Sequence, residues 1–187
     1  MKQIIISALL AASCSVAQAQ EDPVFQSLRE IAQGMPPKLL SVLETEIQKG
    51  GHANAISVCR DKAPAMAKAL SEAKGVQIRR VSLKNRNPKA VPDAWERSAL
   101  EDFDRQAAAG GNVALLEKTE ITQENGKTVY RYMKGLPVQA ACLHCHGNET
   151  QINAKTRERL QELYSDDKAT GYSAGQIRGA ITIKKAL

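Results

Sequence analysis

The run Cys142-Leu143-His144-Cys145-His146 constrains this chain more than any other feature of its 187 residues. Two cysteines separated by two residues, with a histidine directly after the second, have the spacing at which a haem is attached covalently. Both thiols would form thioether bonds to the porphyrin, and His146 would be the proximal ligand of the iron. The motif therefore predicts one haem c held by Cys142, Cys145 and His146, with His144 pointing outward.

The N-terminus predicts export of the chain. Lys2 supplies a positive charge, residues 4–12 are apolar but too few to span a bilayer, and Ala17-Gln18-Ala19 is a small-residue cleavage site. Residues 1–19 are therefore expected to be a signal peptide, and residues 20–187 a single periplasmic domain. This location fits the motif, because bacteria attach haem covalently outside the cytosol. No later segment is expected to span a membrane.

Cysteine usage leaves one thiol to explain. Of the four cysteines, Cys14 lies within the predicted signal peptide. The run Ala11-Ala12-Ser13-Cys14 loosely resembles a lipoprotein processing site, so a lipid anchor on Cys14 is the alternative. Three cysteines remain, and an odd number does not suit a disulfide framework in an oxidising compartment. If the haem uses Cys142 and Cys145, Cys59 alone is unexplained.

The hydrophobic pattern predicts helices in the first half of the mature chain. Apolar residues recur at helical spacing up to Pro36-Pro37, which are expected to break the helix. The pattern resumes at Leu39 and ends at Gly50-Gly51, and a further helical region continues to Gly75. We therefore expect two or more helices before the first strand.

The second half predicts a small antiparallel sheet. Strands are indicated at 76–83, 113–122, 127–134 and 179–184. Asn125-Gly126 favours a tight hairpin between the second and third of these strands. Asp93 and Glu96 form a capping pattern for a helix that ends at Gly110-Gly111, and residues 153–164 indicate another short helix. The expected class is α+β, with N-terminal helices packed on a small antiparallel sheet.

Cys59 falls on the apolar face of the second helical region. At helical spacing it shares an arc with Ile56, so its thiol is expected to face inward. Pro64, five residues later, is expected to kink or restart the helix beside it. A buried structural cysteine is the alternative, because free cysteine behaves in a core as a small hydrophobe. His52, on the same arc, and Met133, in a predicted strand, are competing candidates for a sixth iron ligand.

The chain is mildly basic. Its formal net charge of +6 is spread over much of the sequence and does not suggest a nucleic-acid partner. Such a charge would favour encounter with an acidic redox protein or an anionic membrane surface. A basic loop is a candidate for binding the anionic propionates of a haem, with a solvated loop as the alternative. Its cations are Arg79, Arg80, Lys84, Arg86 and Lys89, and Arg178 is a further candidate.

Five blocks, at residues 55–64, 80–88, 92–96, 142–147 and 171–180, together resemble the bacterial monohaem c-type domain with a PAS-like fold. That family includes small secreted cytochromes and the extracytoplasmic sensor regions of membrane histidine kinases. The resemblance implies a PAS-like sheet preceded by helices, a haem held against it, and axial ligation of the iron by His146 and Cys59. The chain resembles the stand-alone members of the family, since this sequence shows no kinase module.

The resulting expectation is a periplasmic haem protein that senses redox state or a diatomic gas, with a redox or signalling protein as its partner. A thiolate ligand favours ferric iron, so we expect Cys59 to bind in the oxidised state and to be released on reduction. A simple one-electron carrier is the alternative. A third hypothesis is a zinc-binding structural domain that uses Cys59, Cys142, Cys145 and His146. No nucleophile and base pair or phosphate-binding loop indicates an enzyme.

Overall fold

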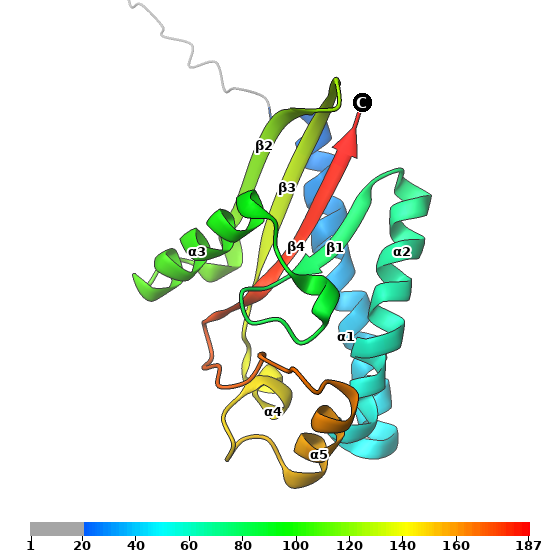
Figure 1. Ribbon diagram of the computed structural model, residues 1–187, viewed down its shortest axis with the longest axis vertical. Helices are drawn as coiled ribbons and strands as arrows, with labels where there is room; N and C mark the ends of the chain where they lie inside the picture. Colours follow the sequence, from blue (N-terminus) through cyan, green and yellow to red (C-terminus); the bar gives the residue numbers. More distant parts are fainter. Residues whose placement is uncertain (1–20) are drawn as a thin grey trace, which may run out of the picture.

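The computed structural model describes residues 21–187 and combines helices with a four-stranded antiparallel sheet (Figure 1). In spatial order the strands are β1 (Gln77–Val81), β4 (Ile177–Ala186), β3 (Lys127–Pro137) and β2 (Glu117–Glu124). This architecture confirms the predicted α+β class. The predicted signal peptide and Cys14 lie outside the described residues, and within residues 21–187 no helix is long and apolar enough to cross a bilayer.

Helix α1 (Pro23–Ser57) runs through Pro36-Pro37, so the predicted break at these prolines is wrong. Each proline removes a backbone donor and crowds the preceding turn. Leu28 and Ala32, fully buried against the sheet just before the prolines, hold the helix in place, because tertiary packing stabilises protein helices more than propensity does. The interruption comes instead at Gly50-Gly51, where the backbone leaves the helical conformation.

A π-helical segment, η1 (Val58–Lys62), joins α1 to helix α2 (Ala63–Lys74). Pro64 lies just after this segment and has no amide proton to donate to the preceding turn. The backbone stays helical from Ser57 to Ala63, so the expected kink or restart beside Cys59 takes the form of a π-helical turn within a continuous helix. Gly75 ends α2 in the left-handed conformation, with a φ of 63°, as the pattern predicted.

The sheet contains the predicted hairpin. Asn125 and Gly126 both have positive φ, 53° and 76°, which a tight turn between twisted strands requires. Strand β2 begins four residues later than predicted, because residues 113–115 form a 3₁₀ turn. Asn112 caps this turn by accepting a hydrogen bond from the amide of Ala114 at 3.1 Å. The strands predicted at 76–83 and 179–184 correspond to β1 and β4, which pair with each other.

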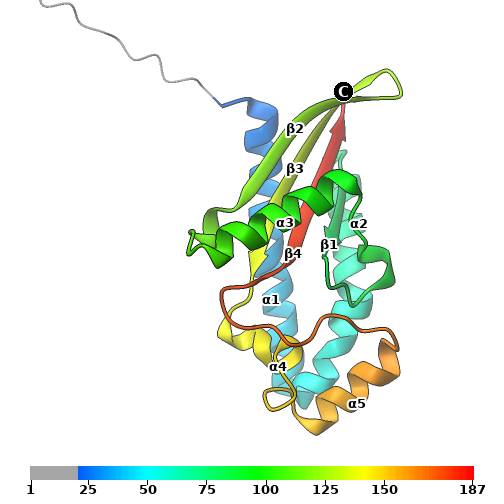
Figure 2. The ribbon, with the colours of Figure 1, turned by 60° about the vertical axis from the view of Figure 1, so that its left-hand side comes forward.

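Helices α1 and α3 (Ala94–Ala108) cover opposite faces of the sheet (Figure 2). The predicted capping box is confirmed, since the side chains of Asp93 and Glu96 each accept a hydrogen bond from the backbone amide of the other residue. The core between α3 and the sheet includes Val81, Phe103, Met133 and Ala180. The core between α1 and the sheet includes Leu28, Ile78, Tyr132 and Ile183.

Two short helices lie beyond one end of the sheet, beside the second half of α1 (Figures 1 and 2). They are α4 (Leu143–His146) and α5 (Ala154–Leu163), the latter capped by Asn153 as part of the helix predicted at 153–164. Ile56 of α1 packs against Leu160 and Tyr164 in a small separate core. This contact holds the segment that follows the cysteine motif against the end of α1.

Candidate functional site

The cysteine motif forms a short helical segment between β3 and α5. It comprises the 3₁₀ turn η4 (Ala140–Cys142) followed by α4. Cys145 and His146 are half-buried, as is Cys142, whereas His144 is exposed as predicted. Cys142 packs against a small core of Val138, Ala169 and Tyr172. The motif is therefore attached to the loop that precedes β4.

That loop fixes the orientation of the His146 ring. The amide of Tyr172 donates to the carbonyl of His146 at 2.9 Å, and the ring Nδ1 lies 2.7 Å from the carbonyl oxygen of Ala169. At this distance Nδ1 carries the proton and donates it, which leaves Nε2 with a free lone pair. Arg178 Nε, 3.2 Å from the same Nδ1, then acts as a nearby charge and not as a donor. A carbonyl that accepts one ring N–H is typical of metal-binding histidines.

His146 is kept neutral by its surroundings. Burial lowers its pKa well below the usual 6.5, and the charges of Arg178 and Arg86 lower it further. A neutral imidazole can bind a metal ion without first releasing a proton. The ring is thus prepared, in both tautomer and charge, to act as a ligand through Nε2.

Cys59, on η1, lies close to the two cysteines of the motif. It lies near enough to Cys145 and to Arg80 for a charge on its sulfur to affect their pKa values. Burial raises the pKa of Cys145 to about 11, an effect that Arg86 opposes. Cys59 is only half-buried, so it is not packed away as a small hydrophobic residue. The structure therefore brings the three cysteines of residues 21–187 into one region.

The other candidate ligands have different surroundings. His52 stacks on the exposed ring of His144, with ring centroids 4.5 Å apart. Met133 is fully buried in the core between the sheet and α3, on the face of the sheet opposite α1. Met133 is therefore a core residue, and His52 contacts the outward side of α4.

The zinc hypothesis requires four donors around one point. Among residues 21–187, no three His, Cys, Asp or Glu side chains lie close enough together to share a metal ion. The tetrahedral set of Cys59, Cys142, Cys145 and His146 is therefore not assembled in this structure. The arrangement provides one well-oriented imidazole and separated thiols instead.

Arg86, from the predicted basic loop, is buried and links the cysteine motif to the loop before β4. Its Nε donates to Asp167 Oδ2 at 2.9 Å, and its Nη2 donates to the carbonyl of Cys145 at 2.6 Å. The sequence singled out Arg86 but missed Asp167, because a carboxylate so far along the chain gives no local signal. Tyr172, edge-on to the His146 ring with centroids 6.4 Å apart, was also missed, although it lies in one of the five blocks.

The described residues fit a large, flat, apolar group with anionic edges. Between Ala32 and Ala55 helix α1 has no fully buried side chain, and α2 has none at all. Both helices nevertheless carry apolar side chains that are half-buried, and these include Leu39, Val42, Leu43, Ile47 and Met66. Such surfaces suit a porphyrin, and the cations of the basic loop suit its carboxylates.

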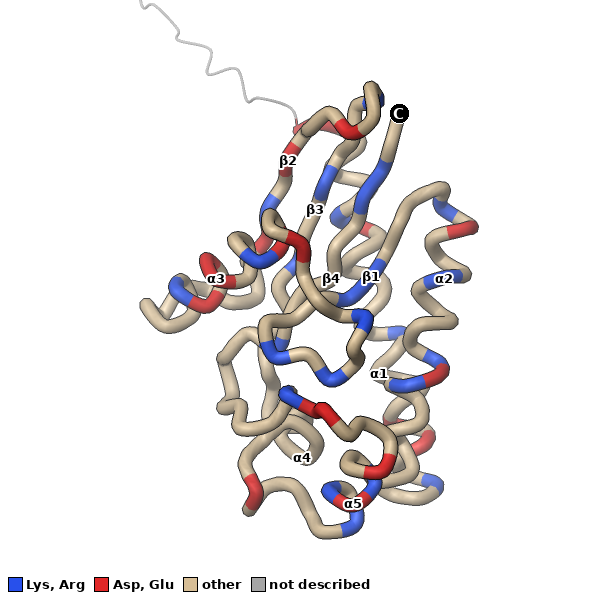
Figure 3. Tube along the Cα trace, in the orientation of Figure 1, with Lys and Arg blue, Asp and Glu red and all other residues tan. Residues whose placement is uncertain are grey.

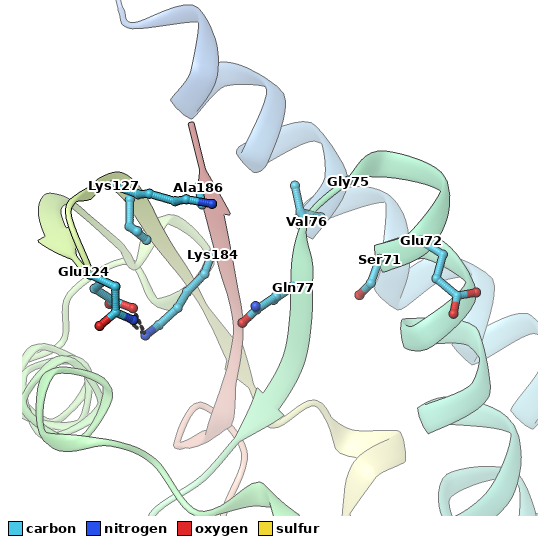
Figure 4. A pocket seen from close by; sticks show the side chains of 11 residues that line it. Ser71, Glu72, Gly75, Val76, Gln77, Glu124, Lys127, Lys184 and Ala186 are labelled. Atoms are coloured by element: carbon cyan, nitrogen blue, oxygen red, sulfur yellow. Dashed lines mark hydrogen bonds and ion pairs between the residues drawn. The ribbon is translucent and has the colours of Figure 1, made fainter.

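A pocket of about 520 Å³ lies at the other end of the sheet, between α2, β1 and the β2–β3 hairpin (Figure 4). Lys184 Nζ donates to Glu124 Oε1 there at 2.9 Å. None of the predicted site residues lines this pocket. The chemistry that the sequence predicted is therefore concentrated near α4 and η1.

Comparisons with known proteins agree with this fold. The crystal structure of the cyanobacterial haem protein Tll0287 superposes with a TM-score of 0.65 at 27% sequence identity, and the match covers 90% of this chain and 97% of that one. No curated protein matches the chain. The model of the Tll0287-like family matches residues 2–185. This chain therefore belongs to the Tll0287-like family.

Proposed function

We propose that this chain is an exported monohaem c-type cytochrome that senses redox state or a diatomic ligand in the periplasm. The proposal is supported by the Cys142–His146 motif, by membership of the Tll0287-like family and by the fact that its structural relative is a haem protein. A bound haem would supply a one-electron redox centre. The proposed role is binding and signalling, with no catalytic step.

The observation that carries the proposal is the geometry of His146. Its Nδ1 proton is committed to the carbonyl of Ala169 at 2.7 Å, so Nε2 is the only ring atom left for iron. Cys142 and Cys145, on the same short helical segment, would hold the porphyrin through thioether bonds. A histidine oriented only by solvent would not support this role.

Cys59 is proposed as the second axial ligand. Supporting this, it is half-buried, near Cys145, and carried on the π-helical segment η1. Single π-helical turns within helices are rare and are frequent at functional sites. A thiolate stabilises ferric iron more than ferrous iron, so Cys59 is expected to bind in the oxidised protein and to leave in the reduced one. A shift of η1 would then transmit the redox state to α2 and to a partner protein.

Optical spectra in both oxidation states test this proposal. The full chain is matured in a host that attaches haem, and the wild type is compared with Cys59→Ala and with His52→Ala as the matched control. We expect a six-coordinate ferric spectrum that only Cys59→Ala converts to a five-coordinate one, and a change of coordination on reduction of the wild type. Unchanged six-coordinate spectra in both states would support a simple electron carrier. Loss of the sixth ligand in His52→Ala would assign that role to His52.

A further inference from the structure

Strand β1 directs two adjacent arginines to opposite faces of the sheet. Side chains of a strand alternate between its faces. Arg79 and Val81 lie on the face covered by α3, where Arg79 pairs with the buried carboxylate of Glu96. Ile78 lies on the other face, in the core with α1, and Arg80 follows it on that face. Arg80 therefore extends from the edge of the α1 core toward the haem-binding end of the sheet.

Arg80 lies among the residues of the proposed haem site. Loss of hydration lowers its pKa, while Cys59 and Cys142, near enough for their charges to act on it, raise it. Its side chain is nevertheless accessible to solvent. Ser82, two residues further along, accepts a hydrogen bond from Arg178, whose Nε lies 3.2 Å from His146 Nδ1, so the end of β1 that carries Arg80 lies beside the motif. Within residues 21–187, Arg80 has no ion pair and no side-chain hydrogen bond.

The other cations near the motif already have partners. Arg86 is held by Asp167 and by the carbonyl of Cys145. Arg178 donates to Ser82 Oγ at 2.9 Å. Lys84 donates to the carbonyl of Thr170 at 2.6 Å and lies 4.4 Å from the centre of the Tyr172 ring.

Lys89 lies in the segment after β1, where Figure 3 shows several Lys and Arg positions in blue. It is exposed, and it is not among the largest charges that act on Cys145 or on His146. Of the cations that the sequence offered for an anionic ligand, Arg80 alone is both at the site and unpaired.

We propose that Arg80 binds a propionate carboxylate of the haem. The inference rests on the proposed function, since it requires a haem at Cys142 and Cys145. Arg80 has no counter-charge among the described residues, and a carboxylate matches the planar fork of a guanidinium with two parallel hydrogen bonds. The contact fixes one edge of the porphyrin to β1, while the thioether bonds fix it to α4. Arg80 is thus a positioning residue.

Chemical labelling of the propionates in the matured holoprotein tests this assignment. A water-soluble carbodiimide and glycine ethyl ester couple to accessible carboxyl groups, and the mass of the tryptic haem peptide reports how many propionates have reacted. The variants are Arg80→Gln, with Arg80→Lys as a second variant that keeps the charge, and Lys89→Gln as the matched control from the same loop. Far-ultraviolet circular dichroism and the Soret band verify that each variant is folded and loaded.

We expect Arg80→Gln to increase the rate of propionate labelling about ten-fold, because a charge-assisted hydrogen-bonded pair protects the carboxylate. Arg80→Lys is expected to increase it by a few fold, and Lys89→Gln to leave it unchanged. Equal rates in wild type and both Arg80 variants, or an increase only in Lys89→Gln, would overturn the assignment. Absence of a haem peptide from wild-type digests would instead overturn the proposed function itself.

Discussion

Arg178 carries a buried positive charge beside His146, and its replacement is expected to change the midpoint potential of the proposed haem. Arg178 Nε lies 3.2 Å from His146 Nδ1, and its Nη1 is anchored on Ser82 Oγ and the carbonyl of Lys84. A fixed positive charge close to the iron ligand disfavours the more positive ferric state. If His146 binds the haem iron as proposed, Arg178 is therefore expected to influence the midpoint potential.

Replacing Arg178→Met is expected to lower the midpoint potential, by about 2 kcal/mol of electron-transfer free energy. Arg178→Lys, which keeps a positive charge, should retain most of the wild-type value. Spectroelectrochemical titration of the matured proteins measures both. A potential that stays unchanged or rises in Arg178→Met would show that this charge does not act on the iron.

At the scale of residues, the sequence predicted the atoms that would touch the cofactor better than the atoms that orient them. The spacing of Cys142, Cys145 and His146 is a local signal. The partners of His146 are the carbonyl of Ala169 and the side chain of Arg178, which are far along the chain and come close only when the loop before β4 folds back. Every residue has a backbone carbonyl, so a hydrogen bond to one cannot be predicted from the type of the amino acid.

At the scale of elements, a charged contact joins α1 to the sheet. Arg29 Nε donates to Glu117 Oε1 at 3.0 Å, and the hydroxyl of Tyr132 donates to Oε2 at 2.8 Å. The hydrogen bond from Arg29 lowers the pKa of Glu117 below its ordinary 4.5. A lowered folded-state pKa contributes stability above the unfolded value, and that stability is lost as the pH falls through the folded-state value.

We therefore expect Glu117→Gln to decrease the free energy of unfolding at pH 7 by about 1–3 kcal/mol. The difference from wild type should shrink as the pH falls below the ordinary carboxylate range. Urea unfolding at several pH values measures this dependence. Glu120→Gln, at an exposed position on the same strand, is the control, and a constant difference across the pH range would contradict the assignment.

Two glycines make a matched pair for testing the packing of these elements. A Cβ at Gly179 would lie 2.3 Å from the carbonyl oxygen of Val81, and its φ is +148°, whereas a Cβ at Gly34 within α1 would meet nothing within 4 Å. Gly179→Ala is expected to cost more than about 2 kcal/mol. Gly34→Ala is expected to add about 0.5–1 kcal/mol. Thermal unfolding measures both, and equal effects would contradict the close approach of β4 to β1.

Element types were predicted from local patterns, and the exceptions have identifiable causes. Pro36-Pro37 did not end α1, because contacts of Leu28 and Ala32 with the sheet outweigh the local cost. The π-helical form of η1 at Cys59 had no sequence signature beyond Pro64. Residues 113–115 looked like a strand through their apolar side chains, yet Asn112 caps a turn there.

At the scale of the whole molecule, the two ends of the sheet differ in how well the helices are buried. The α3 face and the first third of α1 form continuous cores, whereas the second half of α1 and the first turn of α2 pack less completely. The proposed haem site lies at this less completely packed end. A bound group there would stabilise the fold by binding the native state and not the unfolded state.

The double variant Cys142→Ala/Cys145→Ala should therefore lose protection from hydrogen exchange mainly at residues 33–54 and 63–74. Exchange in β3 and β4 should remain close to that of wild type. Hydrogen exchange followed by mass spectrometry compares the matured wild type with the variant. A uniform loss of protection over the whole chain would mean that the cysteine motif supports the entire fold and not one end of it.

The central claim is that the cysteines of the motif carry a covalently attached haem. The most direct measurement is acid-acetone extraction of the purified, matured chain, followed by mass spectrometry of the polypeptide. The account predicts that the pigment stays with the protein and that its mass increases by one haem, an increase lost in Cys142→Ala/Cys145→Ala. A colourless protein, or a pigment that passes into the acetone and leaves the polypeptide at its unmodified mass, would contradict it.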